Sequence, residues 1–130
     1  MVITGGGWPV TTATVAIYDE RGQTWSNIPP LNTARAHHAC GGYKNEYKER
    51  VSVLRTVCYD DLTISRQVYV VVGGMSGPGT SDLLSSTEIF TEDGEYWTLF
   101  HSSLPAPLSH LRGVTVDNTV FITGHHYMQL

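Results

Sequence analysis

Six histidines and two cysteines carry the side chains of this chain best suited to metal binding. His37-His38 with Cys40, and His125-His126, bring together ligand types that zinc prefers. Neighbouring residues of an extended strand point to opposite faces, so at most one histidine of each pair can face a given site. The chain contains neither a Cys-x-x-Cys nor a His-x-x-x-His spacing. The sequence therefore predicts no metal site and no cofactor.

Glycine runs and carboxylate pairs are the other patterns that could carry chemistry. The glycines at 5–7 and 73–74 would form phosphate-binding loops if a Gly-Lys-Ser/Thr or Gly-x-Gly-x-x-Gly pattern opened a helix behind them, and neither does. Asp60-Asp61 and Glu92-Asp93 fall in predicted turns, where carboxylates are solvated. General acid–base catalysis needs burial and a facing partner group. No catalytic residue is predicted.

Composition limits the class of protein and its partners. The chain has 130 residues, of which 41% are hydrophobic and 15% charged, which suits one globular domain over residues 1–130. Its net charge of −4 supplies no phosphate-binding surface, so nucleic acid is not an expected partner. The longest clean apolar run, 68–72, has five residues, whereas a membrane helix needs about 20. With two cysteines and no signal peptide at the start of the sequence, we expect a reduced, cytoplasmic protein.

Short strand-like runs end on glycine three times, as VITGGG (2–7), VVVGGM (70–75) and FITGHH (121–126). Glycine at the end of a packed strand lets another backbone approach closely and permits a positive φ for the exit turn. Twice an aromatic residue also precedes a tryptophan by seven positions, with acidic residues and a glycine between them. This spacing predicts two large side chains on neighbouring strands, joined by a short hairpin turn.

The order of apolar strand, glycine pair, variable loop, aromatic residue and tryptophan resembles the kelch repeat. The residues that carry the resemblance are Gly5, Gly6, Tyr18 and Trp25 in the first copy, Gly73, Gly74, Phe90 and Trp97 in the second, and Gly124 in the third. The third copy departs from the pattern because a histidine follows its glycine. Kelch repeats form four-stranded blades of a β-propeller. The resemblance thus implies an all-β fold, a partial kelch-type β-propeller of about two to two-and-a-half antiparallel blades in an incomplete ring.

The resemblance also implies an order of strands along the chain. The innermost strand is expected near 36–40 and 111–117, the second at 1–5, 68–73 and 119–124, the third at 13–18 and 86–90, and the outer one at 23–26 and 95–99. Little helix is expected, because no segment shows a 3.6-residue period. Residues 1–40 would form one blade portion, 41–67 an inserted loop or hairpin, and 68–130 the second blade with the start of a third.

An insert accounts for the unequal lengths of the two tryptophan-to-glycine intervals. The interval from Trp25 to Gly73 spans 48 positions and that from Trp97 to Gly124 spans 27, a difference of 21. The first half of the insert, 43–50, is charged and polar, and its second half alternates around Val53 and Val57. We predict a lengthened hairpin between the inner and second strands, tipped by a charged loop that is either solvated or a partner-binding protrusion. Cys40 and Cys58 flank this insert, either as free thiols or meeting across the hairpin.

Two blades are too few to close a ring, because propellers generally have about 4–8 blades. Unpaired strand edges and open apolar faces would remain at both sides. We therefore expect the rest of the propeller to come from a longer chain of which this sequence is a part. Assembly of several chains into one ring is the alternative.

The resemblance implies a non-catalytic protein–protein interaction module. Substrate recognition in a cullin-based ubiquitin ligase adaptor, scaffolding and actin binding are the finer roles found in kelch proteins. Loops around the central channel of kelch propellers commonly bind short acidic peptides, and Arg35, Arg66 and Arg112 are the cations at predicted strand ends that would contact such a protein partner. The alternative is a fragment of a kelch-like propeller enzyme of the galactose-oxidase type.

Overall fold

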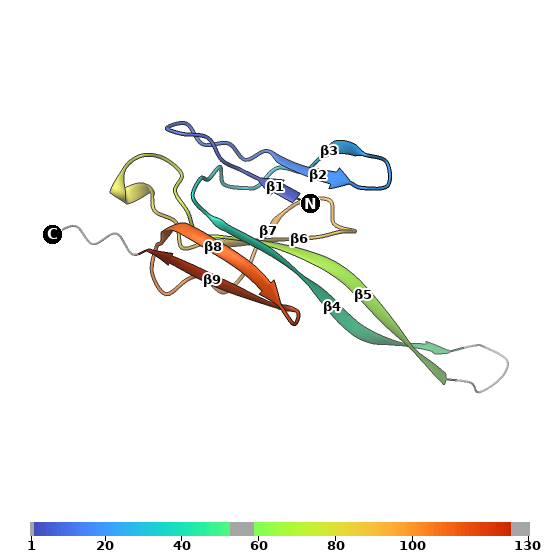
Figure 1. Cartoon of the computed structure of the whole chain (residues 1–130). Helices are drawn as coiled ribbons and strands as arrows, with labels where there is room; N and C mark the ends of the chain where they lie inside the picture. Colours follow the sequence, from blue (N-terminus) through green and yellow to red (C-terminus); the bar gives the residue numbers. More distant parts are fainter. Residues whose placement is uncertain (1, 53–58, 126–130) are drawn as a thin grey trace.

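The computed structural model describes residues 2–52 and 59–125 (Figure 1). Its strands are β1 (Val2–Thr4), β2 (Val15–Asp19), β3 (Thr24–Ile28), β4 (Ala39–Ser52), β5 (Tyr59–Val72), β6 (Thr87–Thr91), β7 (Thr98–Leu99), β8 (Ser109–Val116) and β9 (Thr119–His125). A 3-10 turn at Thr80–Asp82 is the one helical element in this part of the chain. The prediction of an all-β fold is confirmed. Among the described residues, no helix has the length and apolar character needed to cross a membrane.

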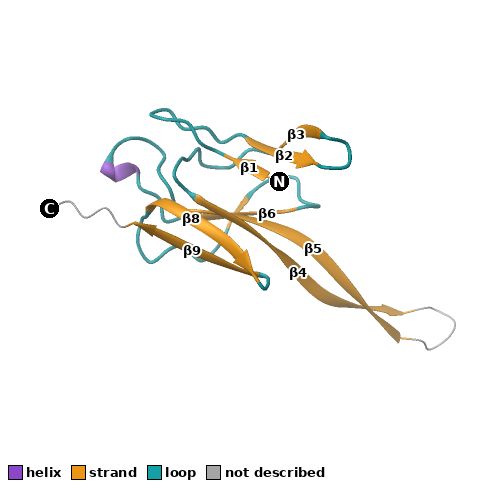
Figure 2. Cartoon of the chain, viewed as in Figure 1, coloured by secondary structure: helices purple, strands orange, loops and turns teal. Residues whose placement is uncertain are grey.

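The strands form three open antiparallel sheets (Figure 2), with orders β1-β2-β3, β4-β5-β6-β7 and β8-β9. We refer to these sheets as unit 1, unit 2 and unit 3. Unit 2 has the four strands expected of a complete repeat, whereas units 1 and 3 have three and two. Within each sheet, neighbouring strands follow the predicted order, and several bounds shift. The inner strand begins at Ala39, after the expected 36–40 start, and the outer strand of unit 2 shrinks to Thr98–Leu99.

The aromatic pairs occupy the neighbouring positions that their spacing predicts. Tyr18 on β2 lies opposite Trp25 on β3, with ring centroids 5.1 Å apart. Phe90 on β6 contacts Trp97, just before β7, with centroids 5.4 Å apart. The same seven-residue spacing thus builds the same aromatic contact in units 1 and 2.

The glycine pairs take the backbone conformations that explain their place in the repeat. Gly5-Gly6 and Gly73-Gly74 all have positive φ, between 58° and 109°. The N–H of Gly6 donates to the carbonyl of Arg35, and the N–H of Gly74 donates to the carbonyl of Leu108, each at 2.8 Å. A Cβ on Gly5 would lie 2.5 Å from the Arg35 carbonyl oxygen. Each pair therefore lets a strand end pack against the segment that leads into the next unit.

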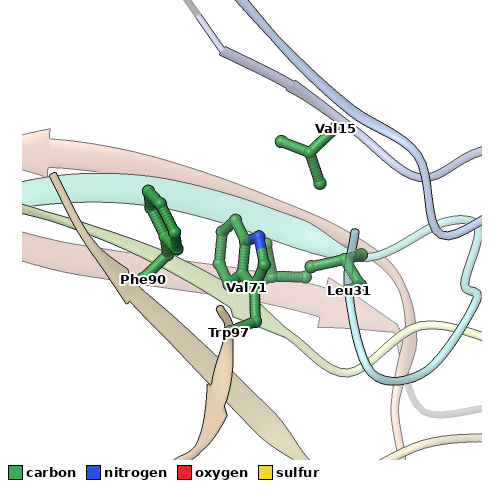
Figure 3. Packing of buried hydrophobic residues seen from close by; sticks show 5 residues of the cluster. All are labelled: Val15, Leu31, Val71, Phe90 and Trp97. Carbon is green, nitrogen blue, oxygen red and sulfur yellow. The ribbon is translucent and has the colours of Figure 1, made fainter. Parts of the chain in front are cut away.

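The main core lies between units 1 and 2 (Figure 3). Its buried members are Val15, Leu31, Val71, Phe90 and Trp97. The indole N–H of Trp97 donates to the carbonyl of Pro29 at 2.9 Å, so the loop between β3 and β4 closes over this ring. Trp97 is 2% exposed, whereas Trp25, its counterpart in unit 1, is 48% exposed. The tryptophan of a unit is thus buried where another unit precedes it, as unit 1 precedes unit 2.

The insert forms a lengthened hairpin, as the sequence predicts. The expected positions of its charged residues are wrong, because 43–50 belongs to β4 rather than to a tip loop, and Asp60-Asp61 belongs to β5 rather than to a turn. β4 and β5 pair without interruption from Ala39 opposite Val72 to Ser52 opposite Tyr59. Figure 1 shows this two-stranded ribbon extending well beyond β6 and beyond the β8–β9 sheet. Its tip, residues 53–58, lies outside the described residues, and so do the expected alternation around Val53 and Val57 and any encounter with Cys58. Cys40 is a free, exposed thiol.

Candidate functional site

A cavity of about 570 Å³ opens where the loops of all three units meet. It is lined by Trp8 from the β1–β2 loop, His37 from the β3–β4 loop, Met75, Pro78, Thr80 and Leu83 from the β5–β6 loop, and Ser109 and His110 from the start of β8. Binding cavities in proteins commonly have about this volume, with mostly apolar walls and a few polar groups. The loops that the repeat leaves variable therefore build one shared site.

Two histidines from successive repeats stack in this cavity. The rings of His37 and His110 have centroids 4.3 Å apart and planes inclined by 21°, and Trp8 meets His37 edge-on at 5.4 Å. Both histidines have left-handed backbone, with φ of 54° and 53°. Such φ values are uncommon outside glycine and concentrate at functional sites. The Ser109 hydroxyl lies 3.0 Å from Nδ1 of His110 and fixes that ring.

The chemistry of the lining limits what the cavity can hold. None of its residues is a lysine, an arginine or a carboxylate, and its walls combine an indole, a thioether and aliphatic groups with hydroxyls and imidazoles. Imidazole nitrogens either donate or accept hydrogen bonds, depending on the tautomer. Within the described residues, no three His, Cys, Asp or Glu side chains are grouped so as to hold a metal ion. The arrangement suits an apolar or aromatic group that also makes a few hydrogen bonds.

Arg35 does not line this cavity and is buried inside the protein. Its burial is at odds with the expectation that it contacts a protein partner. Its side chain is 0% exposed and forms a 2.7 Å ion pair with Glu88, which is equally buried. It also donates to the carbonyls of Gly73 and Ser86, at 2.9 and 3.2 Å. Burial lowers the pKa of Arg35, while the attraction of Glu88 opposes that shift. Arg35 therefore joins the loop before β4 to β5 and β6.

The other two predicted cations lie in separate surroundings. Arg66, near the base of the ribbon, forms a half-exposed 3.1 Å ion pair with Asp93 in the β6–β7 turn. Arg112 is exposed on β8, opposite Thr123 of β9. Neither residue lines the cavity. The three arginines thus occupy an interior, a ribbon base and a sheet surface, rather than one binding face.

The residues that line the cavity were largely missed by sequence reasoning. The sequence offers His37 either as a zinc ligand type or as a structural residue of the Arg-Ala-His-His run at 35–38, which resembles a kelch inner strand, and it does not single out Trp8 or His110. One signal was present, because a histidine follows the Pro-containing segment in both copies, at His37 after IPPL and at His110 after LPAPL. A repeated polar residue at a loop end is a reasonable marker of a shared site. A search of the chain against protein-family models finds no match, and neither does a search of the curated proteins.

His38, beside His37 in the sequence, is mostly buried between two units. Its Nε2 lies 2.8 Å from the hydroxyl of Thr4, and a Cβ on Gly5 would lie 2.9 Å from its ring. Burial, and next the positive charge of Arg35, lower the pKa of His38 to about 4. Leu111 takes the same place against Gly73 in the following repeat. The position therefore favours a neutral side chain.

Replacing His38 with leucine should make the protein less sensitive to acid. An unfolded chain protonates this histidine below about pH 6.5, whereas the folded chain does so only near pH 4. The free energy of unfolding should therefore fall by roughly 2 kcal/mol between pH 7 and pH 5 through this group alone. Urea denaturation of wild type and His38→Leu at both pH values measures the difference. Equal losses in the two proteins would contradict the assignment.

Proposed function

We propose that this chain is part of a kelch-type β-propeller and acts as a non-catalytic protein-interaction module. The cavity shared by the loops of three successive units carries this proposal, because a partner seated there would contact every unit at once. The glycine pairs and aromatic pairs, which recur with matching geometry in units 1 and 2, support the kelch assignment. Function in such a fold is determined by its loops, which vary while the strands are kept.

Apolar faces at both ends of the three-unit stack support further blades. Trp25 and Ile3 are 48% and 52% exposed on unit 1, at positions whose counterparts Trp97 and Val71 are buried in unit 2. On unit 3, Val114, Val116 and Phe121 are each at least half exposed. The interface between units 1 and 2 shows what covers such a face, namely another sheet of the same kind. We propose that the rest of the propeller supplies those sheets.

The partner that fits the cavity is a peptide segment of another protein. An apolar or aromatic side chain would pack against Trp8, Met75 and Leu83, while its backbone bonds to the imidazoles and hydroxyls of the rim. The resemblance to kelch proteins adds a finer role, substrate recognition for a cullin-based ubiquitin ligase. That role is part of the proposal and rests on the resemblance alone.

Selection of peptides from a displayed random library tests the proposed site. We expect enriched peptides to bind the immobilised chain and to lose at least tenfold in affinity when His37 and His110 are both changed to alanine. His101→Ala is the matched control, because His101 is an exposed histidine outside the cavity and should leave binding unchanged. Isothermal titration calorimetry of the selected peptides gives the affinities. Failure to enrich any peptide, or equal binding by the double variant, would contradict the proposal.

A further inference from the structure

The two faces of each sheet differ in the unit that they meet. The face of unit 1 that packs on unit 2 carries Val2, Val15 and Ile28. The face of unit 2 that it covers carries Tyr69, Val71, Phe90 and Trp97. We call the face that a unit turns to the following unit its trailing face, and the face that it turns to the preceding unit its leading face. The contact between units 1 and 2 thus joins a trailing face to a leading face.

The contact between units 2 and 3 has the same sense, and Figure 1 shows unit 1 and unit 3 on opposite sides of unit 2. Gly41 on β4 lies opposite Val70, which points away from unit 1 because its neighbour Val71 points toward it. A Cβ on Gly41 would lie 2.7 Å from Cγ1 of Val120 on β9. Unit 3 therefore covers the trailing face of unit 2 with its own leading face, which includes Val120.

Equivalent positions of the repeat form the same kind of face. The residue two positions before the strand-end glycine is Val71 in unit 2 and Ile122 in unit 3, where it lies on the same side of β9 as Val120. Both residues belong to leading faces. The same position in unit 1 is occupied by Ile3, which is 52% exposed. The exposed face around Ile3 is therefore the leading face of unit 1.

The described part of the chain leaves one face of each kind exposed. The leading face of unit 1 carries Ile3, Tyr18 and Trp25. The trailing face of unit 3 carries Val114, Val116 and Phe121, each at least half exposed. Both contacts within the chain join unlike faces. The free trailing face of one copy therefore matches the free leading face of another copy, whereas two like faces have no precedent in the fold.

We propose that two copies of this chain close one ring of six sheets, in which unit 3 of each copy packs on unit 1 of the other. This inference rests on the proposed function, because it takes the fold to be a propeller and names the second copy as the source of the remaining sheets. Propellers generally have about 4–8 blades, so three sheets are too few and six are enough. A two-fold axis relates the two contacts, so every free face is covered and no further copy adds.

The side chains on the two free faces resemble those that already pack between units 1 and 2. There, Val15 and Leu31 cover the rings of Phe90 and Trp97. In the ring, the equivalent aromatic pair of unit 1 would be covered by the valines and Phe121 of the second copy. Because each contact relies on a few large side chains, we expect the dimer to form at about 10–100 µM and to dissociate at about 1 µM, which leaves the faces exposed in the dilute chain.

Lysine substitution on each free face tests the ring. Ile3→Lys charges the leading face of unit 1, and Phe121→Lys charges the trailing face of unit 3. Val10→Lys is the matched control, because Val10 is 81% exposed in the β1–β2 loop, which bonds to unit 2 through Thr11 and Ser76. By sedimentation equilibrium at about 100 µM, wild type and Val10→Lys should have twice the 14.3 kDa chain mass. Ile3→Lys and Phe121→Lys should each have the mass of one chain. Urea denaturation shows whether each variant is folded, and Val116→Lys replaces Phe121→Lys if that variant is not.

A mixture of the two lysine variants tests whether unlike faces meet. Either variant alone carries a lysine in both contacts of the ring. The equimolar mixture keeps one contact intact, between unit 3 of Ile3→Lys and unit 1 of Phe121→Lys, so it should contain more dimer than either variant alone. If like faces paired instead, one of the two variants would remain dimeric by itself.

Peptide binding separates the ring from the proposed function. One copy builds the whole cavity, so monomeric Ile3→Lys should bind the selected peptides as wild type does. A monomeric wild type, a species larger than a dimer, a folded lysine variant of either face that stays dimeric, loss of the dimer in Val10→Lys, or a mixture no more associated than its components would each overturn the ring. None of these results would change the cavity. A dimeric wild type that binds no peptide would keep the ring and overturn the interaction module.

Discussion

Changing Arg35 to methionine should lower the free energy of unfolding by about 3–5 kcal/mol. In the wild-type protein the carboxylate of Glu88 lies 2.7 Å from the guanidinium of Arg35, and both side chains are fully buried. The substitution leaves that carboxylate buried without its cation. The same carboxylate also accepts the backbone N–H groups of Asn32 and Thr33, so it cannot move to solvent without breaking the loop before β4. Methionine keeps much of the aliphatic volume, which isolates the loss of charge from the loss of packing.

Arg112→Met is the control for this prediction, because Arg112 is exposed and should cost no more than about 0.5 kcal/mol. A double variant, Arg35→Met with Glu88→Leu, separates the two contributions. It removes both charges, so its loss should be smaller than the sum of the two single losses by about 1–3 kcal/mol. Urea denaturation followed by tryptophan fluorescence measures the losses for Arg35→Met, Glu88→Leu, the double variant and Arg112→Met. Strict additivity would show that the two side chains do not act as a pair.

The strand order was predictable because the repeat places its signals in the local sequence. A glycine that needs a positive φ and two aromatic residues seven positions apart depend on a turn and two neighbouring strands, so the chain itself encodes them. The lengthened hairpin was predictable for the same reason, since an insertion between two paired strands extends both of them. The bounds of β7 could not be predicted in this way, because Trp97 is held by a hydrogen bond to the carbonyl of Pro29 in another unit rather than by strand pairing.

The site was much less predictable, because it depends on contacts between units. Nothing near Arg35 in the sequence indicates that it is buried or that it pairs with Glu88, which lies 53 positions away. Trp8 and His110 come from different units, and they line one cavity only when units 1 and 3 are both docked on unit 2. Sequence spacing describes positions within one sheet. The ion pair and the cavity both arise where sheets meet.

Changing Trp97 to alanine should cost about 3–5 kcal/mol, the range for emptying a buried aromatic position. The indole is 2% exposed, contacts Phe90, and donates to Pro29 across the boundary between units 1 and 2. Trp25→Ala is an unusually close control, because the two tryptophans hold the same place in successive repeats and differ in what covers them. Because Trp25 is 48% exposed, Trp25→Ala should lower the free energy of unfolding by only about 1 kcal/mol. Thermal and urea denaturation of both variants measure the two losses. Since the chemistry removed is identical, a difference between them reports the packing of one unit on another, and equal losses would place the core within each sheet rather than between sheets.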